Sequence, residues 1–222
     1  MPRRISRPPH SGSLDAIFRP RSVAVIGASR KRQTIGREIL ANLVEYGFNG
    51  PVYPVNKTAE AIHSIRCFRS IKDIPGPVDL AIVTVPKDQV LPVVEACGKK
   101  GVRGLIVITA GFKEIGADGA LLEAKLKAKL AGFRMRMIGP NCMGVVNTEP
   151  DVKLNATFAA TTPVRGNVGF VSQSGALGEA ILADAVENGL GVAMCVSMGN
   201  KTDVSGNDLL EYWEDNADIQ AI

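Results

Sequence analysis

The sequence predicts an α/β protein, with a Rossmann-like parallel sheet followed by the start of a second α/β unit. Short runs rich in Val and Ile alternate with amphipathic stretches along most of the chain, which is the pattern of a parallel sheet covered by helices. The alternation is interrupted by a weakly patterned stretch before Gly166 and then restarts. The 222 residues provide enough material for one large domain or two modest ones.

Five strands and three helices are expected in the first unit. Apolar runs predict strands at residues 22–26, 52–55, 79–84, 104–109 and 134–138. A helix is predicted at residues 35–46, because five aliphatic side chains there share one helical face: Ile35, Ile39, Leu40, Leu43 and Val44. Similar spacing predicts helices at 87–99 and 117–131.

The second unit is expected to hold a strand at 167–171, a helix at 175–188, a strand at 192–197 and a helix at 206–215. Its final residues, DIQAI, look like the opening of another buried strand. Two strands and two helices are too few to close a core, so we expect this unit to be completed by a further segment or a partner chain. The expected regions are a disordered tail at 1–13, a first domain at 14–148, a linker at 149–165 and an incomplete second domain at 166–222.

Composition and charge exclude several classes of protein. The longest apolar runs, LAIVTV and GLIVITAG, are far shorter than the roughly 18 to 20 residues that a membrane span needs. The first 13 residues are rich in Arg and Pro without an apolar core, so they are not a secretory signal. Residues 1–37 contain nine Lys and Arg residues and one acid, whereas the remaining residues have a net charge of −4. A nucleic-acid surface spread over the whole fold is therefore not expected.

The four cysteines show no paired spacing and there are two histidines, His10 and His63. This pattern excludes the familiar zinc motifs, so no metal site is expected, and it favours a reducing cytoplasm. Cys142 has no recognisable base as a partner and is expected to be a buried or turn cysteine. Ser205 and Asp208 have the spacing of a helix cap.

The loop in VAVIGASRKRQTIG, residues 23–36, is the first candidate binding site. It fails the G-x-G-x-x-G pattern, because Ala and Ser follow Gly27, and this weakens the case for NAD. The amides near Thr34 and Gly36 open a helix and would face an anion, aided by the hydroxyls of Ser29 and Thr34. An ordinary loop between a strand and a helix remains the alternative.

The second predicted strand ends in Asn56 and Lys57. An NAD site has an acid at this point, whereas a cation suits a ribose that carries a phosphate, as in NADP or coenzyme A. Surface lysines are common, so Lys57 alone is weak evidence.

The segment GFVSQSGALG places Ser172 and Ser174 where a strand meets a helix. Hydroxyls and amides there could hold a phosphoryl group, or the serines could simply cap the helix. The nucleophile pattern G-x-S-x-G is not met, because residues 172 and 176 are Ser and Ala.

Six segments in the same order resemble the NDP-forming acyl-CoA synthetases, the superfamily of succinyl-CoA synthetase alpha subunits and ADP-forming acetate-CoA ligases. They are GASRKRQTIG, YPVNK, VDLAIVTVP, IVITAGF, IGPNCMGVVN and VGFVSQSGALG. The resemblance runs from about Ser13 to the end, and SMGNKTDVSGNDLLEYWEDN is more similar to the acetate-CoA ligase branch.

The resemblance implies a CoA-binding Rossmann-like domain and the start of a flavodoxin-like ligase domain near Gly166. Such enzymes interconvert an acid, CoA and ATP with acyl-CoA, ADP and phosphate, through an acyl phosphate and a phosphohistidine. Neither His10 nor His63 matches the histidine motif, so no catalytic residue is expected in this chain. ATP or ADP with Mg would bind outside it, in an ATP-grasp domain or a beta-type subunit, and the substrate would be a small carboxylic acid or its acyl-CoA.

The resemblance also implies roles for single residues. Ser29, Thr34 and Gly36 would line the CoA phosphates, and Lys57 would meet CoA near its adenosine end. Further along the cofactor, Val85 and Pro86 would border it, Ile108, Thr109 and Ala110 would pass along its pantetheine arm, and Asn141 would lie at the reacting end. The succinate branch has an acid in place of Ala110. The proposed phosphate pocket comprises Ser172, Ser174 and Gly175.

Two other functions remain open from the sequence. One is a noncatalytic CoA-binding or regulatory module, as in relatives fused to an acetyltransferase domain. The other is an NADP-dependent oxidoreductase, which the missing glycine pattern and the GPNC turn disfavour.

Overall fold

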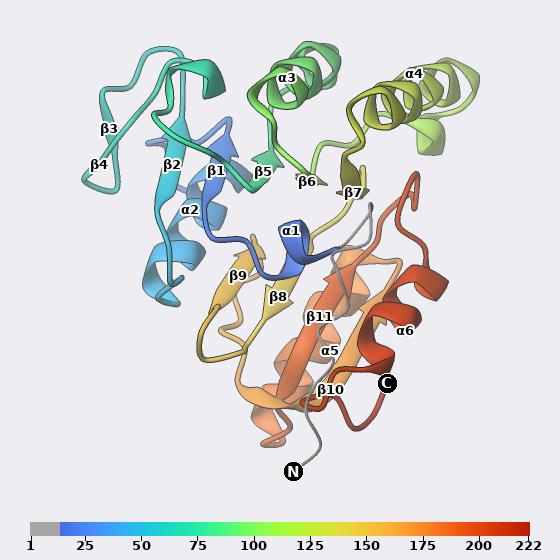
Figure 1. Cartoon of the computed structure of the whole chain (residues 1–222). Helices are drawn as coiled ribbons and strands as arrows, with labels where there is room; N and C mark the ends of the chain where they lie inside the picture. Colours follow the sequence, from blue (N-terminus) through green and yellow to red (C-terminus); the bar gives the residue numbers. More distant parts are fainter. Residues whose placement is uncertain (1–13) are drawn as a thin grey trace, which may run out of the picture.

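The computed structural model describes residues 14–222 and contains a five-stranded parallel sheet, a four-stranded mixed sheet and a small hairpin. The tail prediction for residues 1–13 lies outside the described part. The first sheet has the order β2-β1-β5-β6-β7 (Figure 1). Its strands are β1 (Val23–Ile26), β2 (Val52–Val55), β5 (Leu80–Val83), β6 (Gly104–Val107) and β7 (Arg136–Ile138). Between β2 and β5 lie the hairpin strands β3 (Ala61–Ile62) and β4 (Ile65–Arg66) and the 3-10 turn η1 (Ile71–Asp73).

Helices cover both faces of this sheet, as the alternating pattern predicted. They are α2 (Ile35–Glu45), α3 (Lys87–Lys100) and α4 (Ala117–Phe133), with a 3-10 turn η2 (Lys113–Ile115) before α4. In β1, Val23 and Val25 pack in the core on the α2 face, whereas Ala24 and Ile26 pack in the core beneath α3 and α4. Because side chains alternate along a strand, each short apolar run supplies two cores at once. The doubly wound architecture is confirmed.

The second sheet differs in part from the prediction. Its order is β10-β11-β8-β9, with β8 (Gly144–Asn147), β9 (Leu154–Thr157), β10 (Arg165–Ser172) and β11 (Val192–Ser197). The predicted linker, residues 149–165, thus contains a buried strand, β9, that pairs antiparallel with β8. Its sequence LNAT does not read as a strand because Asn155 and Thr157 are polar. Both are buried, and the Thr157 hydroxyl donates to the Asn155 side chain over 2.7 Å.

The second sheet has a small core of its own beneath α5 (Gly175–Glu187), formed by Val146, Leu182, Val192 and Cys195, but its other face joins the core of the first sheet. The short helix α1 (Asp15–Phe18) lies between the two sheets and packs on β6 and β8 (Figure 1). One continuous apolar core contains Phe18, the α2 face of the first sheet, and Trp213 of α6 (Gly206–Glu214). Two strands and two helices were expected to be too few to close a core, and β8, β9 and α1 of this chain do share the core with β11. Completion by a further segment or a partner chain stays a prediction.

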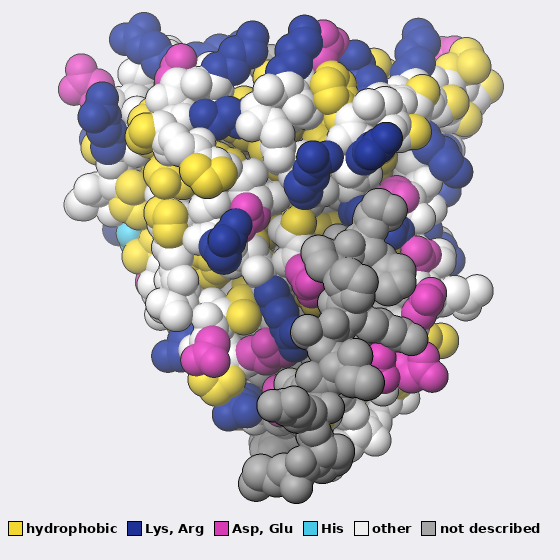
Figure 2. Space-filling model, in the orientation of Figure 1, with side chains coloured by type: hydrophobic (Ala, Val, Ile, Leu, Met, Phe, Trp, Pro, Cys, Tyr) yellow, Lys and Arg dark blue, Asp and Glu magenta, His cyan; other side chains and the backbone are white. Residues whose placement is uncertain are grey.

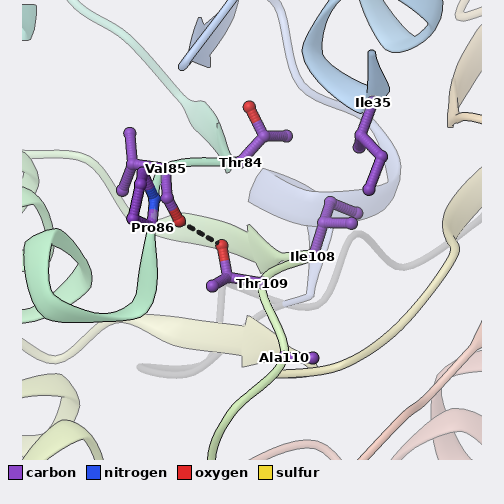
Figure 3. Close-up of a pocket in the computed structure, with 7 residues that line it drawn as sticks. All are labelled: Ile35, Thr84, Val85, Pro86, Ile108, Thr109 and Ala110. Atoms are coloured by element: carbon purple, nitrogen blue, oxygen red, sulfur yellow. Dashed lines mark hydrogen bonds between the residues drawn. The ribbon is translucent and has the colours of Figure 1, made fainter. Parts of the chain in front are cut away.

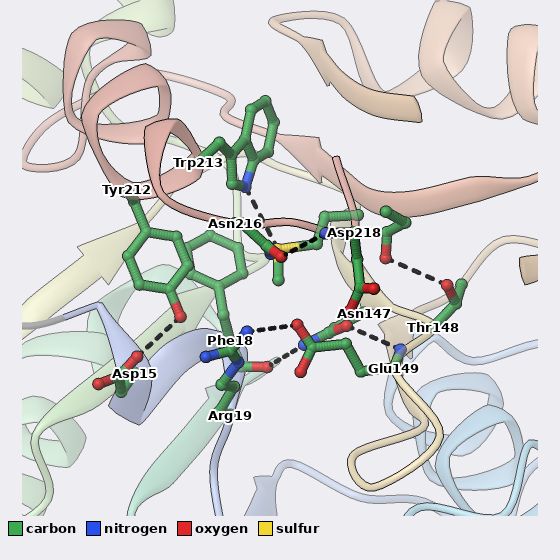
Figure 4. Close-up of polar contacts among 12 residues, drawn as sticks. Asp15, Phe18, Arg19, Asn147, Thr148, Glu149, Tyr212, Trp213, Asn216 and Asp218 are labelled. Atoms are coloured by element: carbon green, nitrogen blue, oxygen red, sulfur yellow. Dashed lines mark hydrogen bonds and ion pairs between the residues drawn. The ribbon is translucent and has the colours of Figure 1, made fainter. Parts of the chain in front are cut away.

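Polar contacts also connect α1 to β8 and to α6 (Figure 4). The Asn147 side chain donates to the Phe18 carbonyl over 2.8 Å, and the Tyr212 hydroxyl donates to Asp15 over 2.8 Å. The rings of Phe18 and Tyr212 stack with centroids 5.1 Å apart. Burial is the main reason that the pKa of Tyr212 is raised, so this hydroxyl stays a donor at neutral pH.

Helix α5 (Gly175–Glu187) covers part of the second sheet, and the chain ends beside β10. Gly169 donates its amide to the Ala221 carbonyl over 2.8 Å, and Val168 and Ala221 form a parallel bridge. The last residues therefore begin to pair with β10, as expected of DIQAI. Over residues 14–222, no helix has the length and apolar composition needed to cross a membrane.

Candidate functional site

The predicted site residues of the first unit lie at the carboxyl ends of its parallel strands. Lys57 follows β2, the loop 27–34 follows β1, Val85 follows β5, Ala110 follows β6 and Asn141 follows β7. In a sheet of this order, ligands bind outside the carboxyl ends of the strands, at the point where the order reverses. Here that point lies between β1 and β5.

An open pocket of about 330 Å³ lies at this edge (Figure 3). Its lining residues are Ile35, Thr84, Val85, Pro86, Ile108, Thr109 and Ala110. Five of these seven were predicted. Ile35 and Thr84 were not assigned to the site, although Ile35 was placed on the predicted helix. The Thr109 hydroxyl donates to the Val85 carbonyl over 2.7 Å and so joins the two strand ends that form the wall.

Gly36 is closely packed at the start of α2. It is buried, and a Cβ atom built on it would lie 2.2 Å from the Gly27 carbonyl oxygen and 2.9 Å from the Thr84 hydroxyl oxygen. Gly27 itself has φ +97 and leaves a similarly small space beside Thr84. Gly36 therefore lets α2 approach the end of β1, and its predicted place along the CoA phosphates stays a prediction.

The hydroxyls in the loop 29–34 shape the loop itself. The Ser29 hydroxyl oxygen accepts from the Lys31 amide over 3.1 Å, and the Thr34 hydroxyl donates to the Lys31 carbonyl over 2.7 Å. The proton of Thr34 is thus used inside the loop here, and its predicted contact with an anion stays a prediction. In the first turn of α2, the amides of Arg37 and Glu38 donate to the Thr34 carbonyl, which leaves those of Ile35 and Gly36 for an anion. Arg30, Lys31 and Arg32 are exposed around them.

Asn56 and Lys57 lie next to this loop. The Asn56 amide group donates to the Ala28 carbonyl over 2.8 Å, and its oxygen accepts from the Thr58 amide over 2.9 Å, so Asn56 joins the two strand ends. Lys57 is exposed and donates to the Gln89 side chain of α3 over 3.2 Å. Its ammonium group is held beside the carboxyl edge, outside the lining of the pocket.

The turn that follows β7 carries Asn141, which has a left-handed backbone with φ 59. Its amide donates to the Thr109 carbonyl over 3.1 Å, which places the turn next to the pocket wall. Cys142 is buried as predicted, and burial raises the pKa of its thiol to about 12. A thiol so protected from ionisation is not a nucleophile at neutral pH.

Ser172 and Ser174 lie at the carboxyl end of β10 and the start of α5. The Ser174 hydroxyl oxygen accepts from the Leu177 amide over 3.3 Å, which confirms its capping role, and the Ser172 hydroxyl donates to the Ser174 carbonyl over 2.9 Å. Gly175 lies against the turn after β7, because a Cβ atom on it would be 3.3 Å from the Cβ of Met143. The two candidate sites are therefore neighbours across Met143.

The two parts of the molecule differ in surface charge. In Figure 2, Lys and Arg side chains are spread over the part formed by the first sheet and its helices, and acidic side chains gather near α6. The sequence after Lys201 contains six acidic residues and no Lys or Arg. The positive charge therefore accompanies the unit that holds the pocket.

Family models match both parts of the chain. One described as a CoA binding domain matches residues 21–148, and one described as a succinyl-CoA ligase like flavodoxin domain matches residues 165–222. The chain belongs to the NDP-forming acyl-CoA synthetase family. The prediction of a CoA-binding first unit followed by a flavodoxin-like unit is confirmed by these matches.

Members of this family resemble the chain over nearly its full length. The alpha subunit of ADP-forming acetate-CoA ligase II from Pyrococcus furiosus is 45% identical over 94% of this chain and 45% of its own length. The ADP-forming acetate-CoA ligase of Methanocaldococcus jannaschii is 44% identical over 94% of this chain and 29% of its own length.

Solved structures agree. The dinucleotide forming acetyl-coenzyme A synthetase 1 of Ca. Korarchaeum cryptofilum, in complex with phosphate and ADP, superposes with a TM-score of 0.90 at 42% identity, over 94% of this chain and 44% of that one. A protein from Pyrococcus horikoshii gives a TM-score of 0.91 at 44% identity, over 95% of this chain and 47% of that one. The chain spans less than half the length of these relatives.

Proposed function

We propose that this chain is the CoA-binding part of an ADP-forming acyl-CoA synthetase, acting on a small carboxylic acid of about the size of acetate. The complete enzyme converts the acid, CoA and ATP into acyl-CoA, ADP and phosphate. A phosphohistidine and the ATP site with its Mg come from segments outside this chain, in an ATP-grasp domain or a beta-type subunit. The names of the relatives and the match to the CoA binding domain support this assignment.

The order of the strand ends carries the proposal. From β2 to β7 the carboxyl edge presents, in turn, Lys57, the anion-binding loop, the pocket wall and Asn141. Four strand spacings of about 4.8 Å make this edge roughly 19 Å long. CoA is an elongated ligand whose 3′-phosphate, diphosphate, pantetheine and thiol follow one another. Its groups fit the edge in that order, with the thiol at Asn141.

The region where β10 meets α5 fits the other reactant, the acyl phosphate. Amides at the start of α5, with Ser172, Ser174 and Gly175, provide a place for a phosphoryl group beside Met143. In the proposed step, the CoA sulfur bonds to the carbonyl carbon of the acyl phosphate. The bond from that carbon to the phosphate oxygen breaks, and phosphate leaves towards the α5 amides.

Calorimetric titration of the 222-residue chain tests the binding part of this proposal. CoA is expected to bind and NADPH is not, because the loop lacks the dinucleotide glycines. Binding of NADPH in preference to CoA would contradict the assignment and favour an oxidoreductase.

The chain alone is expected to form no acyl-CoA and to take up no phosphate from radiolabelled ATP. His63 lies in the turn between β3 and β4, with its Nε2 3.8 Å from Glu45 at the end of α2. That is about 15 Å along the helix from Ile35 at the pocket. Label mapped to His63 would show that the catalytic group has been misplaced. If the whole polypeptide or complex binds CoA but forms no acyl-CoA, the noncatalytic module is the better description.

A further inference from the structure

A polar cluster with a buried centre and an exposed rim joins the end of the pocket to the second sheet. It consists of Lys113 and Glu114 in η2, Glu123 in α4, and Asn200 and Thr202 in the loop after β11. Asn200 is 6% exposed and Glu123 is also 6% exposed. We call these five residues the Asn200 cluster. None of them was assigned to the site from the sequence.

Asn200 is the centre of the cluster, and its side chain is fully used. The two hydrogens of its amide group meet two carboxylates, Glu114 at 2.6 Å and Glu123 at 2.9 Å. Its side-chain oxygen accepts from the Asn141 side chain over 3.5 Å. An asparagine amide has two donors and an acceptor oxygen, and each is directed at a different element here.

Through Glu114, Asn200 reaches the pocket wall. The other oxygen of the Glu114 carboxylate accepts from the amides of Gly111 and Phe112, the latter over 3.1 Å. Gly111 directly follows Ala110, which lines the pocket. The path from Asn200 to the wall therefore passes through a single side chain.

The backbone around Asn200 is pressed against the turn that carries Asn141. The Asn200 amide donates to the Pro140 carbonyl over 2.9 Å. Gly199 has φ 55, and a Cβ atom on it would lie 2.3 Å from the carbonyl oxygens of both Pro140 and Asn141. The loop and the turn thus have no room to move independently.

We propose that Asn200 is a positioning residue, which holds the Ala110 end of the pocket and the Asn141 turn in the arrangement that receives the pantetheine and thiol end of CoA. This inference rests on the proposed CoA site. A neutral amide suits the position because two carboxylates face it with one cation, Lys113, so that an aspartate there would add a third negative charge.

Two ligands measured on the 222-residue chain test this role. CoA extends to the Asn141 end, whereas adenosine 3′,5′-bisphosphate contains the adenosine end alone. In Asn200→Ala, the affinity for CoA is expected to fall at least about tenfold, as for a lost buried hydrogen-bond network. The affinity for the bisphosphate is expected to stay within about twofold of wild type, which corresponds to less than 0.5 kcal/mol.

Thr202→Val is the matched control. The Thr202 hydroxyl donates to Glu123 over 2.5 Å within the same cluster, and no hydrogen bond joins it to Glu114 or Asn141 among the described residues. It is expected to lower the melting temperature without changing CoA affinity. Glu114→Gln is a second test on an exposed side chain, should Asn200→Ala fail to fold. It is expected to weaken CoA and spare the bisphosphate.

The possible outcomes are distinct. Equal losses for both ligands, or unchanged CoA affinity in the folded Asn200→Ala and Glu114→Gln variants, would overturn the positioning role and leave the CoA site in place. A wild-type chain that binds neither ligand would instead overturn the proposed function, and this inference with it.

Discussion

Lys57 provides a positive charge at the outer end of the proposed CoA site. Its ammonium group donates to Gln89, so the side chain is already directed along the carboxyl edge towards α3 rather than free in solvent. A charge-assisted hydrogen bond to a phosphate is worth more than one between neutral groups, because the acceptor is ionised. We therefore expect Lys57 to distinguish a ribose with a phosphate from one without it.

Replacement of Lys57 tests this role. Lys57→Ala is expected to weaken CoA by about 1.5 to 3 kcal/mol and dephospho-CoA much less, because the lost contact is to the ribose phosphate. Calorimetric titration with the two ligands measures the difference. Lys127→Ala, an exposed lysine on α4, is the control and should bind both ligands like wild type. Equal losses for CoA and dephospho-CoA would remove the assignment.

Single residues at the pocket were predictable where they follow a strand directly. Val85 and Ala110 belong to apolar runs whose ends can be read from the sequence. The role of Asn200 could not be predicted, because it depends on a loop meeting a turn about sixty residues earlier in the chain. Gly36 was recognised as part of the site, but its contact with Gly27 is visible only once α2 is packed on β1.

At the scale of elements, helices and strands were predictable when their apolar period extended over several residues. Helix α2, predicted at 35–46, spans Ile35–Glu45, and β11 matches the prediction at both ends. The missed elements α1 and β9 are short, with four residues each. Strand β9 alternates apolar residues with buried polar ones that satisfy each other. Their burial depends on the tertiary fold, which local pattern does not contain.

Two glycines give a matched test of how α2 sits on the sheet. Gly36→Ala is expected to destabilise the protein by several kcal/mol, because its Cβ would meet backbone that cannot move away. Gly132→Ala, in the exposed last turn of α4 with no atom within 4 Å of its Cβ, is expected to stabilise by up to about 1 kcal/mol. Urea unfolding measures both. A Gly36→Ala protein as stable as wild type would contradict the close packing.

Across the whole molecule, charged contacts hold the two sheets in one arrangement. Arg136 of β7 pairs with Asp203, which precedes α6, at 3.0 Å and with Asp208, in the first turn of α6, at 2.8 Å. Glu123 of α4 also joins the two parts, because its carboxylate accepts hydrogen bonds from Asn200 and Thr202 in the loop after β11. Burial by itself raises the pKa of Glu123, but hydrogen bonds from Thr202, Asn200 and Lys113 outweigh it and hold the pKa below its ordinary value.

This shift predicts a loss of stability in acid. Because the folded-state pKa of Glu123 is lower than the unfolded one, ionisation favours the folded state. The contribution is complete above the unfolded value of about 4.3 and is lost as the pH falls through the folded value. Glu123→Gln is expected to lower the free energy of unfolding by about 1 to 3 kcal/mol at pH 7.

Urea titrations at pH 7 and at pH 3 measure this effect. The difference between wild type and Glu123→Gln should shrink at the lower pH, because the carboxylate of the unfolded chain is protonated there and the unfolded state gains stability. Glu211→Gln, on the exposed side of α6, is the control. A difference that stays the same at both pH values would show that the charge of Glu123 does not contribute.

Helix α1 has a consequence for how this protein can be divided. The match to the CoA binding domain spans residues 21–148, so a fragment cut there lacks Ile17 and Phe18 and separates β8 from β9. Both lost side chains are 0% exposed, and the face of the first sheet beneath them is apolar. The segment that matches the CoA binding domain is thus smaller than the structural unit that shares one core. Grafting the CoA site into another protein would require α1 and the second sheet to travel with it.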